Sequence, residues 1–176
     1  MNSEWVARGK NGFTIVELLI VIVVIGILAA IIVVSYNGTQ NRANDSRRLS
    51  DMQSIQQSLE AYKTINGSYP AVTGANQDPS WYETSYITGS FLNPLAASGT
   101  VNKVPVDPIN NSTYFYRYYL YSTGEYGCDS SRGAFYVLSI VTLQSKTGTG
   151  HGPGFSCSLR NWATEDAAWV TGGFTN

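Results

Sequence analysis

Glu17 is the residue whose type and position most clearly call for chemistry. It lies near the start of a long apolar run from Phe13 to Val34 and is the only charged residue in that run. An isolated charge in a bilayer costs about 2.5–3.5 kcal/mol on insertion scales, so such a carboxylate needs a partner and a purpose. The alternative is that Glu17 lies at headgroup depth and reaches the interface with its side chain.

The apolar run has the length of a membrane span. As a helix, Phe13 to Val34 would be about 33 Å long, and a bilayer core is about 30 Å thick. The apolar core of a secretory signal peptide is shorter, about 7–15 residues, which makes a removed signal peptide the weaker interpretation. The 176-residue chain therefore suits one membrane segment followed by one modest domain.

Two cysteines, Cys128 and Cys157, follow the apolar run. The region after Val34 is poor in charge and rich in Tyr, Ser, Thr, Asn and Gly, which favours an exported surface over a cytosolic enzyme. In an exported domain, two thiols most simply form one disulfide. The alternative is a pair of buried free thiols in a cytosolic domain. The formal net charge of -1 does not indicate a nucleic-acid partner.

The remaining polar residues do not form a catalytic or metal-binding signature. His151 is the only histidine and lies in a glycine-rich segment, so we expect a surface loop. Asp107, Asp129 and the pair 165–166 offer carboxylates, but they lack the dense acidic spacing of a calcium loop and are read as solvated surface. The tyrosines of 114–121 could stack bases or sugars; sheet faces and subunit contacts are the preferred interpretation. We expect no catalytic residue, no metal and no cofactor.

One long helix is predicted from about Phe13 to about Ile65. Its first half is apolar on every face, and its second half carries one apolar stripe at helical spacing, made of Leu49, Met52, Ile55, Leu59 and Tyr62. Asn66-Gly67 ends the pattern and Pro70 prevents its return. Gly26 and Gly38 are the positions where this helix could bend.

The rest of the chain predicts a small antiparallel sheet. A long irregular connection, 67–112, holds one short helix near 90–97. Strands are then predicted over the aromatic and β-branched segments 113–122, 134–143 and 167–171, with a glycine-rich loop at 146–154. The apolar stripe of the long helix is the natural cover for one face of this sheet, so the predicted fold class is α+β.

The N-terminal motif resembles the N-terminus of type IV pilins and type II secretion pseudopilins. The resemblance rests on the segments 12–20 (GFTIVELLI) and 25–31 (IGILAAI). The segments 59–63 and 66–70 are similar to the end of the long helix in this superfamily, and 104–108 (VPVDP) resembles a Pro-x-Asp-Pro element of pseudopilins. The resemblance implies a pilin-like fold, one long helix on an antiparallel sheet. Many members carry a proline near the end of the apolar helix, and this chain has none there.

The resemblance also implies a processing event and an assembly site. A prepilin peptidase would cut between Gly12 and Phe13 and leave Phe13 as an N-methylated N-terminus. The Phe13 ammonium of one subunit could then pair with Glu17 of an incoming subunit and fix the axial register. The implied parts of the chain are a leader (1–12), a membrane and filament-core half-helix (13–35), an amphipathic half-helix (36–65) and a globular head (66–176).

The function implied is that of a structural subunit of a type IV pilus, a helical homopolymer, and not an enzyme. A pseudopilin of a type II secretion system, or a minor pilin that binds DNA or a surface, is the alternative. The implied partners are other copies of the chain, the prepilin peptidase, a membrane platform protein and a cytosolic motor ATPase. The subunit would cross the cytoplasmic membrane once, with its head outside, before it enters an extracellular filament.

Membrane orientation carries one internal conflict. Arg8 and Lys10 precede the apolar run, whereas Arg42, Arg47 and Arg48 follow it. Counted naively, the positive-inside rule favours a cytosolic head. The cysteines and the leader favour an exported head, and we follow them.

Overall fold

The computed structural model describes residues 12–72, 82–87, 91–165 and 167–176. The chain divides into two compact units, Met1–Gln40 and Asn41–Asn176. The first unit holds the N-terminal part of the long helix, and the second holds the remainder of that helix with the sheet.

The long helix, α1, covers Ile15–Asn66 and runs unbroken through Gly26 and Gly38. The predicted bounds, Phe13 and Ile65, are correct to within two residues. The helix ends at a glycine because Gly67 adopts the left-handed conformation (φ 78°) that other residues avoid. Its amide donates to the carbonyl of Lys63 at 2.8 Å, the bond expected of a left-handed C-terminal cap.

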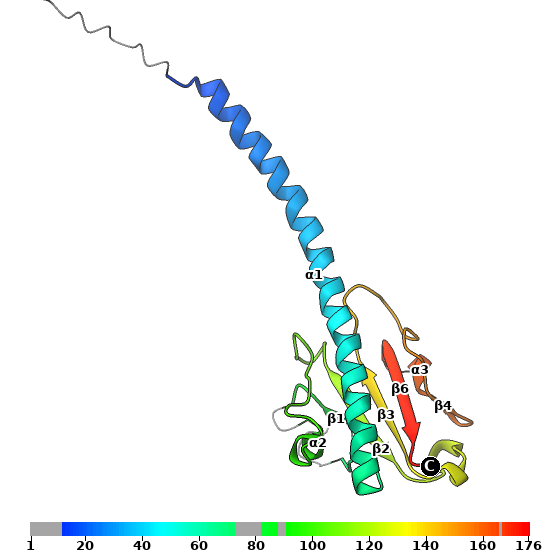
Figure 1. Ribbon diagram of the computed structural model, residues 1–176. Coiled ribbons are helices and arrows are strands. Elements are labelled where there is room, and N and C mark those ends of the chain that lie inside the picture. Colours follow the sequence, from blue (N-terminus) through cyan, green and yellow to red (C-terminus); the bar gives the residue numbers. More distant parts are fainter. Residues whose placement is uncertain (1–11, 73–81, 88–90, 166) are drawn as a thin grey trace, which may run out of the picture. The chain divides into compact units, whose positions relative to one another are not determined.

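A four-stranded antiparallel sheet forms the centre of the second unit (Figure 1). The strand order is β1-β2-β3-β6, and the strands cover Glu83–Thr84, Tyr116–Tyr121, Phe135–Ile140 and Trp169–Phe174. The predicted strands at 113–122 and 134–143 contain β2 and β3, and the one at 167–171 overlaps β6. The two-residue β1 was not predicted, because its sequence has no strand pattern of its own.

The second half of α1 covers one face of this sheet (Figure 1). Met52, Ile55 and Leu59 are at most 1% exposed and join a core with the side chains of β2 and β3 that face them. The prediction was wrong for Leu49, which is 38% exposed. Its neighbour Arg48 is buried instead, and its guanidinium pairs there with Asp45 and Asp107.

The opposite face of the sheet is covered by the C-terminal arm. This arm contains the hairpin of β4 (Ser156–Cys157) and β5 (Arg160–Asn161), followed by the short helix α3 (Trp162–Glu165). Trp162 is buried against Phe135 and Tyr121, and a disulfide joins Cys128 to Cys157 with Cα atoms 4.8 Å apart. Because both faces are covered, every residue of β3 is buried.

Three further short helical turns lie among the described residues of the second unit. The helix α2 covers Asn93–Ala97, inside the segment where a short helix was predicted. Two 3-10 turns, η2 (Glu125–Gly127) and η3 (Ser130–Arg132), connect β2 to β3. The tyrosines of β2 lie mostly in the core: Tyr116 and Tyr118 are fully buried and Tyr121 is 4% exposed, so these three rings are not available to stack bases or sugars.

Candidate functional site

The apolar half of α1 is the largest exposed apolar surface that the structure describes. Ile15, Ile20 and Ile31 expose 81%, 60% and 63% of their surface, and the apolar residues between them are similarly open. Among the described residues, α1 is the one helix with a stretch long and apolar enough to cross a membrane. Water is a poor solvent for such a surface, so this half-helix requires either lipid or other protein around it.

Glu17 lies in the first turn of this half-helix and closes a capping box with Thr14. The amide and the hydroxyl of Thr14 both donate to Oε2 of Glu17 at 2.8 Å. In return, the amide of Glu17 donates to the hydroxyl of Thr14 at 3.2 Å. The reciprocal bonds satisfy backbone donors that have no partner inside the helix.

The capping box means that the carboxylate of Glu17 has hydrogen-bond partners within its own chain. The partial positive charge of the helix N-terminus also favours an anion at this position. Both effects lower the cost of a carboxylate in an apolar segment without neutralising its charge. The carboxylate of Glu17 can therefore still bind a cation that is brought close to it.

Gly12 and Phe13 precede the helix and are both exposed, Phe13 by 85%. A side chain built at Gly12 would meet no atom within 4 Å. The fold of this chain therefore does not require glycine at position 12. Residues 1–11 of the predicted leader lie outside the described residues.

A second polar cluster joins α1 to the head at Arg48. This arginine is fully buried, and it donates to Asp107 through Nε (2.6 Å) and Nη2 (3.0 Å). Its Nη1 donates to Asp45 at 2.7 Å and to the side chain of Gln144 at 3.1 Å. The paired, planar geometry is the one in which arginine binds a carboxylate most strongly. Asp107 belongs to the 104–108 segment that the sequence singled out, but the prediction that it is a solvated surface carboxylate was wrong: it is 3% exposed because it is the buried partner of Arg48.

Asp45 connects the same cluster to the loop after β3. Its carboxylate accepts from the amides of Gln144 and Ser145 at 2.9 and 2.7 Å and from the hydroxyl of Ser145 at 2.6 Å. Burial by itself would raise the pKa of Asp45, but the hydrogen bonds from Ser145, Gln144 and Arg48 outweigh it and hold the pKa below its ordinary value. Likewise, burial would lower the pKa of Arg48, and its bonds to Asp107 and Asp45 raise it instead.

The other carboxylates considered as ligands lie apart from one another. Asp129 caps the turn η3 by accepting from Ser131, and Glu165 pairs with Arg160 at 2.9 Å. Asp166 lies outside the described residues. In the part of the chain that the structure describes, no three His, Cys, Asp or Glu side chains are grouped as metal ligands. His151 is exposed in a loop, where its Nε2 lies 2.9 Å from the carbonyl of Thr147.

Thr14, Arg48 and the residues bonded to Asp45 were given no role in these sites at the level of sequence. Thr14 was visible in the pattern Thr14-Ile15-Val16-Glu17, since Ser or Thr followed three residues later by Glu is the signature of a capping box. Arg48 carried a weaker signal. It is one of the few cations beside the apolar stripe, and Asp107, its partner, lies 59 positions further along the chain.

Comparison with known proteins agrees with these features. Residues 7–33 match the family described as "Prokaryotic N-terminal methylation motif". The chain is 31% identical to type II secretion system core protein G of Escherichia coli K12, over 67% of this chain and 76% of the relative. The proteins of the same name from Pectobacterium carotovorum and Vibrio cholerae are 27% and 24% identical, over 87% and 90% of this chain and 85% and 96% of the relatives. No solved structure matches the chain significantly.

The long helix on its antiparallel sheet, the N-terminal motif and these relatives define one class of protein. The chain belongs to the type IV pilin and pseudopilin superfamily, within the type II secretion protein G family.

Proposed function

We propose that this chain is a pseudopilin, a subunit that assembles through its apolar half-helix into a filament of a type II secretion system. The sequence pattern alone favoured a type IV pilus subunit, with a pseudopilin as the alternative. The relatives support the alternative, because those compared carry the name of a type II secretion core protein. A structural role also agrees with the polar sites described above, which bind the chain to itself.

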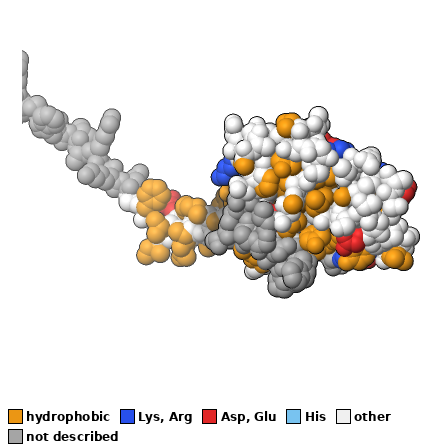
Figure 2. All heavy atoms as spheres, turned by 90° about the horizontal axis from the view of Figure 1, so that it is seen from below, with side chains coloured by type: hydrophobic (Ala, Val, Ile, Leu, Met, Phe, Trp, Pro, Cys, Tyr) orange, Lys and Arg blue, Asp and Glu red, His pale blue; other side chains and the backbone are white. Residues whose placement is uncertain are grey.

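The observation that carries the proposal is the exposed apolar half of α1 with one carboxylate in its first turn. Figure 2 shows apolar side chains open to solvent on this part of the chain. A bilayer would cover them before assembly, and the same half-helices of other copies would cover them in a filament core. Tight packing of helices, with no competing water, is what holds apolar helices together in both settings.

Processing between Gly12 and Phe13 would create the cation that Glu17 requires. We propose that a prepilin peptidase removes residues 1–12 and that Phe13 becomes the N-methylated N-terminus. The free space around Gly12 supports this step. Since the fold of this chain does not require a small residue there, the requirement would come from the peptidase. Before the cut, residue 13 has a peptide amide and no charge, so pairing with Glu17 is prevented.

The ammonium of Phe13 on one subunit then pairs with Glu17 of the next. In an apolar filament core an unpaired charge is expensive, so the pair selects one axial register and penalises the others. Thr14 holds the carboxylate at the helix terminus, where the incoming ammonium arrives. The platform protein and the motor ATPase would supply the force that extracts each subunit from the membrane.

We propose an exported head, although the positive-inside rule, counted on the cations that follow the apolar run, favours a cytosolic one. The disulfide between Cys128 and Cys157 supports export, because such bonds persist in oxidising compartments.

Disruption of the gene in its host, with complementation by the wild-type chain, tests the proposal. We expect exported proteins that normally reach the medium to remain in the cell envelope and to be released again on complementation. Surface pili, counted by electron microscopy, should be unaffected. Normal release of exported proteins together with a loss of surface pili would instead identify a type IV pilus subunit.

A further inference from the structure

The hairpin of β4 and β5 presents one apolar side chain on a rigid support. Leu159, at the tip of this hairpin, is 78% exposed. The preceding β4 is tied to the rest of the head by the disulfide at Cys157, and the amide of Leu159 donates to the carbonyl of Tyr126 at 3.1 Å. The hydroxyl of Ser158 donates to the carbonyl of Gly127 at 3.0 Å.

These restraints make the tip a preorganised contact. Gly127 has the left-handed conformation (φ 72°), and a Cβ there would collide with the Ser158 hydroxyl. The hairpin therefore lies directly on the chain at position 127. A backbone that is already held in place loses little conformational entropy when the side chain it presents binds, which is a property of an interface anchor.

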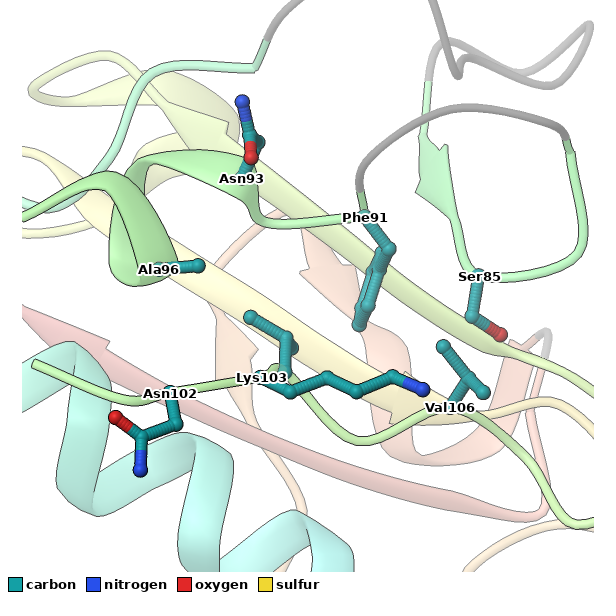
Figure 3. Close-up of a pocket in the computed structure, with 8 residues that line it drawn as sticks. Ser85, Phe91, Asn93, Ala96, Asn102, Lys103 and Val106 are labelled. Carbon is teal, nitrogen blue, oxygen red and sulfur yellow. The ribbon is translucent and has the colours of Figure 1, made fainter. Parts of the chain in front are cut away.

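A cavity of about 230 Å³ lies elsewhere on the head, between α2 and the segment 102–106. Figure 3 shows the ring of Phe91 pointing into it and the side chains of Ala96 and Val106 on its walls. Val104 and Phe91 are buried, at 7% and 5% exposure, and give it an apolar floor. The volume corresponds to about eight waters at roughly 30 Å³ each, so a four-carbon side chain fits.

The hairpin tip and the cavity are also complementary in charge. Lys103 lies at the rim of the cavity. The residues on which the hairpin rests are flanked by two exposed carboxylates, Glu125 and Asp129. Arg160, the cation next to Leu159, is already paired with Glu165. A contact between tip and rim would therefore bring opposite charges together.

The two features lie on different sides of the head. In Figure 1, α2 and β4 lie on opposite sides of the second half of α1. A contact between a tip on one side and a cavity on the other joins two different patches of the chain, so it can repeat from copy to copy. Such a head-to-tail contact produces an open helical assembly where the rotation between copies does not close a ring.

We infer that Leu159 of one subunit inserts into the cavity lined by Phe91, Ala96 and Val104 of a neighbouring subunit, with Lys103 facing Glu125 or Asp129. This inference rests on the proposed function, because it requires that copies of the chain assemble. It assigns the head a specific contact that is separate from the apolar half-helices and from the pair of Phe13 and Glu17.

Photo-crosslinking in the full-length chain tests the contact directly. A benzophenone amino acid replaces Leu159, and in a matched control it replaces Ile65, which is 69% exposed at the end of α1. Cells that produce the chain together with its secretion machinery are irradiated, the crosslinked multimers of the chain are purified and digested, and the crosslinked peptides are identified by mass spectrometry. We expect crosslinks from position 159 to segment 91–106 of a second copy, and none from position 65 to that segment.

The outcomes separate this contact from the proposed function. Filaments in which position 159 crosslinks elsewhere, or not at all, would overturn the contact and leave the function intact. Failure of the wild-type chain to assemble, with its secretion machinery present, would overturn both. In a second measurement, Leu159→Asp should reduce the filament yield at least tenfold while Ile65→Asp leaves it unchanged; equal yields for the two variants would contradict the inference.

Discussion

Arg48 on α1 donates two hydrogen bonds, at 2.6 and 3.0 Å, to Asp107, although 59 positions of sequence separate them. Both side chains are fully buried. The pair links the helix to the segment between α2 and β2, which otherwise contains little regular structure. Asp107 lies between Pro105 and Pro108. The two prolines restrict the backbone that presents its carboxylate to Arg48.

Asp107→Asn should destabilise the head by about 3 kcal/mol, because removal of one partner of a buried ion pair leaves the other charge uncompensated. Asp45 remains as a second partner of Arg48, which places the effect at the lower end of the usual range. Urea unfolding of the full-length chain in detergent, followed by tryptophan fluorescence, measures it. The control, Asp129→Asn, changes an exposed capping residue to an equally good cap and should cost less than about 0.5 kcal/mol. Equal effects of the two changes would contradict the role given to Arg48.

The parts of the fold that depend on local pattern were predictable, and those that depend on distant partners were not. The apolar run, the stripe of Met52, Ile55 and Leu59, and the aromatic strands carry their periodicity in the sequence. The burial of Arg48 does not, because its partner is distant and its residue type predicts exposure. The hairpin of β4 and β5 was missed for a similar reason, since two-residue strands held by a disulfide have no period to detect.

Acid should weaken the head through Asp45. Its pKa is lower in the folded than in the unfolded chain, where an aspartate titrates near ~3.9. The unfolded state therefore binds more protons below that value, and the stabilisation present at higher pH is lost as the pH falls through the folded pKa. Asp45→Asn should flatten this acid limb in urea unfolding measured between pH 2 and pH 6, values that bracket the ordinary pKa by about two units. If Asp45→Asn loses stability at low pH as steeply as the wild type, other groups dominate the acid dependence.

Asp51 should act in the opposite direction. Burial raises its pKa, although Tyr116 donates a hydrogen bond to its carboxylate at 2.8 Å. The folded state then holds its proton more tightly than the unfolded state, so stability falls as the pH rises from the ordinary to the raised pKa. In the same urea titration, the contribution of Asp51 to the free energy of unfolding should therefore change with pH in the opposite direction to that of Asp45.

Replacement of both cysteines by serine should reduce the stability of the head by about 3 kcal/mol, since the bond closes a loop with a sequence separation of 29 residues. Peptide mapping without reduction should recover Cys128 and Cys157 as one linked pair. The double variant should also lose order in the hairpin of β4 and β5, seen as faster amide exchange there than in β3. Two alkylatable thiols in wild-type protein taken from the cell exterior would refute the bond.

Gly12→Leu should block processing. The glycine has free space within this chain, so the larger residue should not disturb folding, and the effect should be confined to the peptidase. Intact mass should show a membrane protein that retains its leader, with no filaments. Gly26→Ala, which also meets no neighbouring atom within 4 Å, is the matched control and should be processed normally. A mature N-terminus at Phe13 in the Gly12→Leu chain would exclude the proposed cleavage site.

Counting filaments made by Glu17→Val is the most direct test of the central claim, that this carboxylate directs assembly. The substitution removes a charge from the apolar segment, so membrane insertion should be at least as efficient as in the wild type. The head should fold and the leader should be removed. Assembly should fail, because the neighbour's Phe13 ammonium would be buried without a counter-charge at a cost of several kcal/mol. Val16→Ala, which keeps the carboxylate, should assemble normally. The account predicts processed, folded, membrane-retained subunits with few or no filaments; wild-type filament number and length in Glu17→Val cells would contradict it.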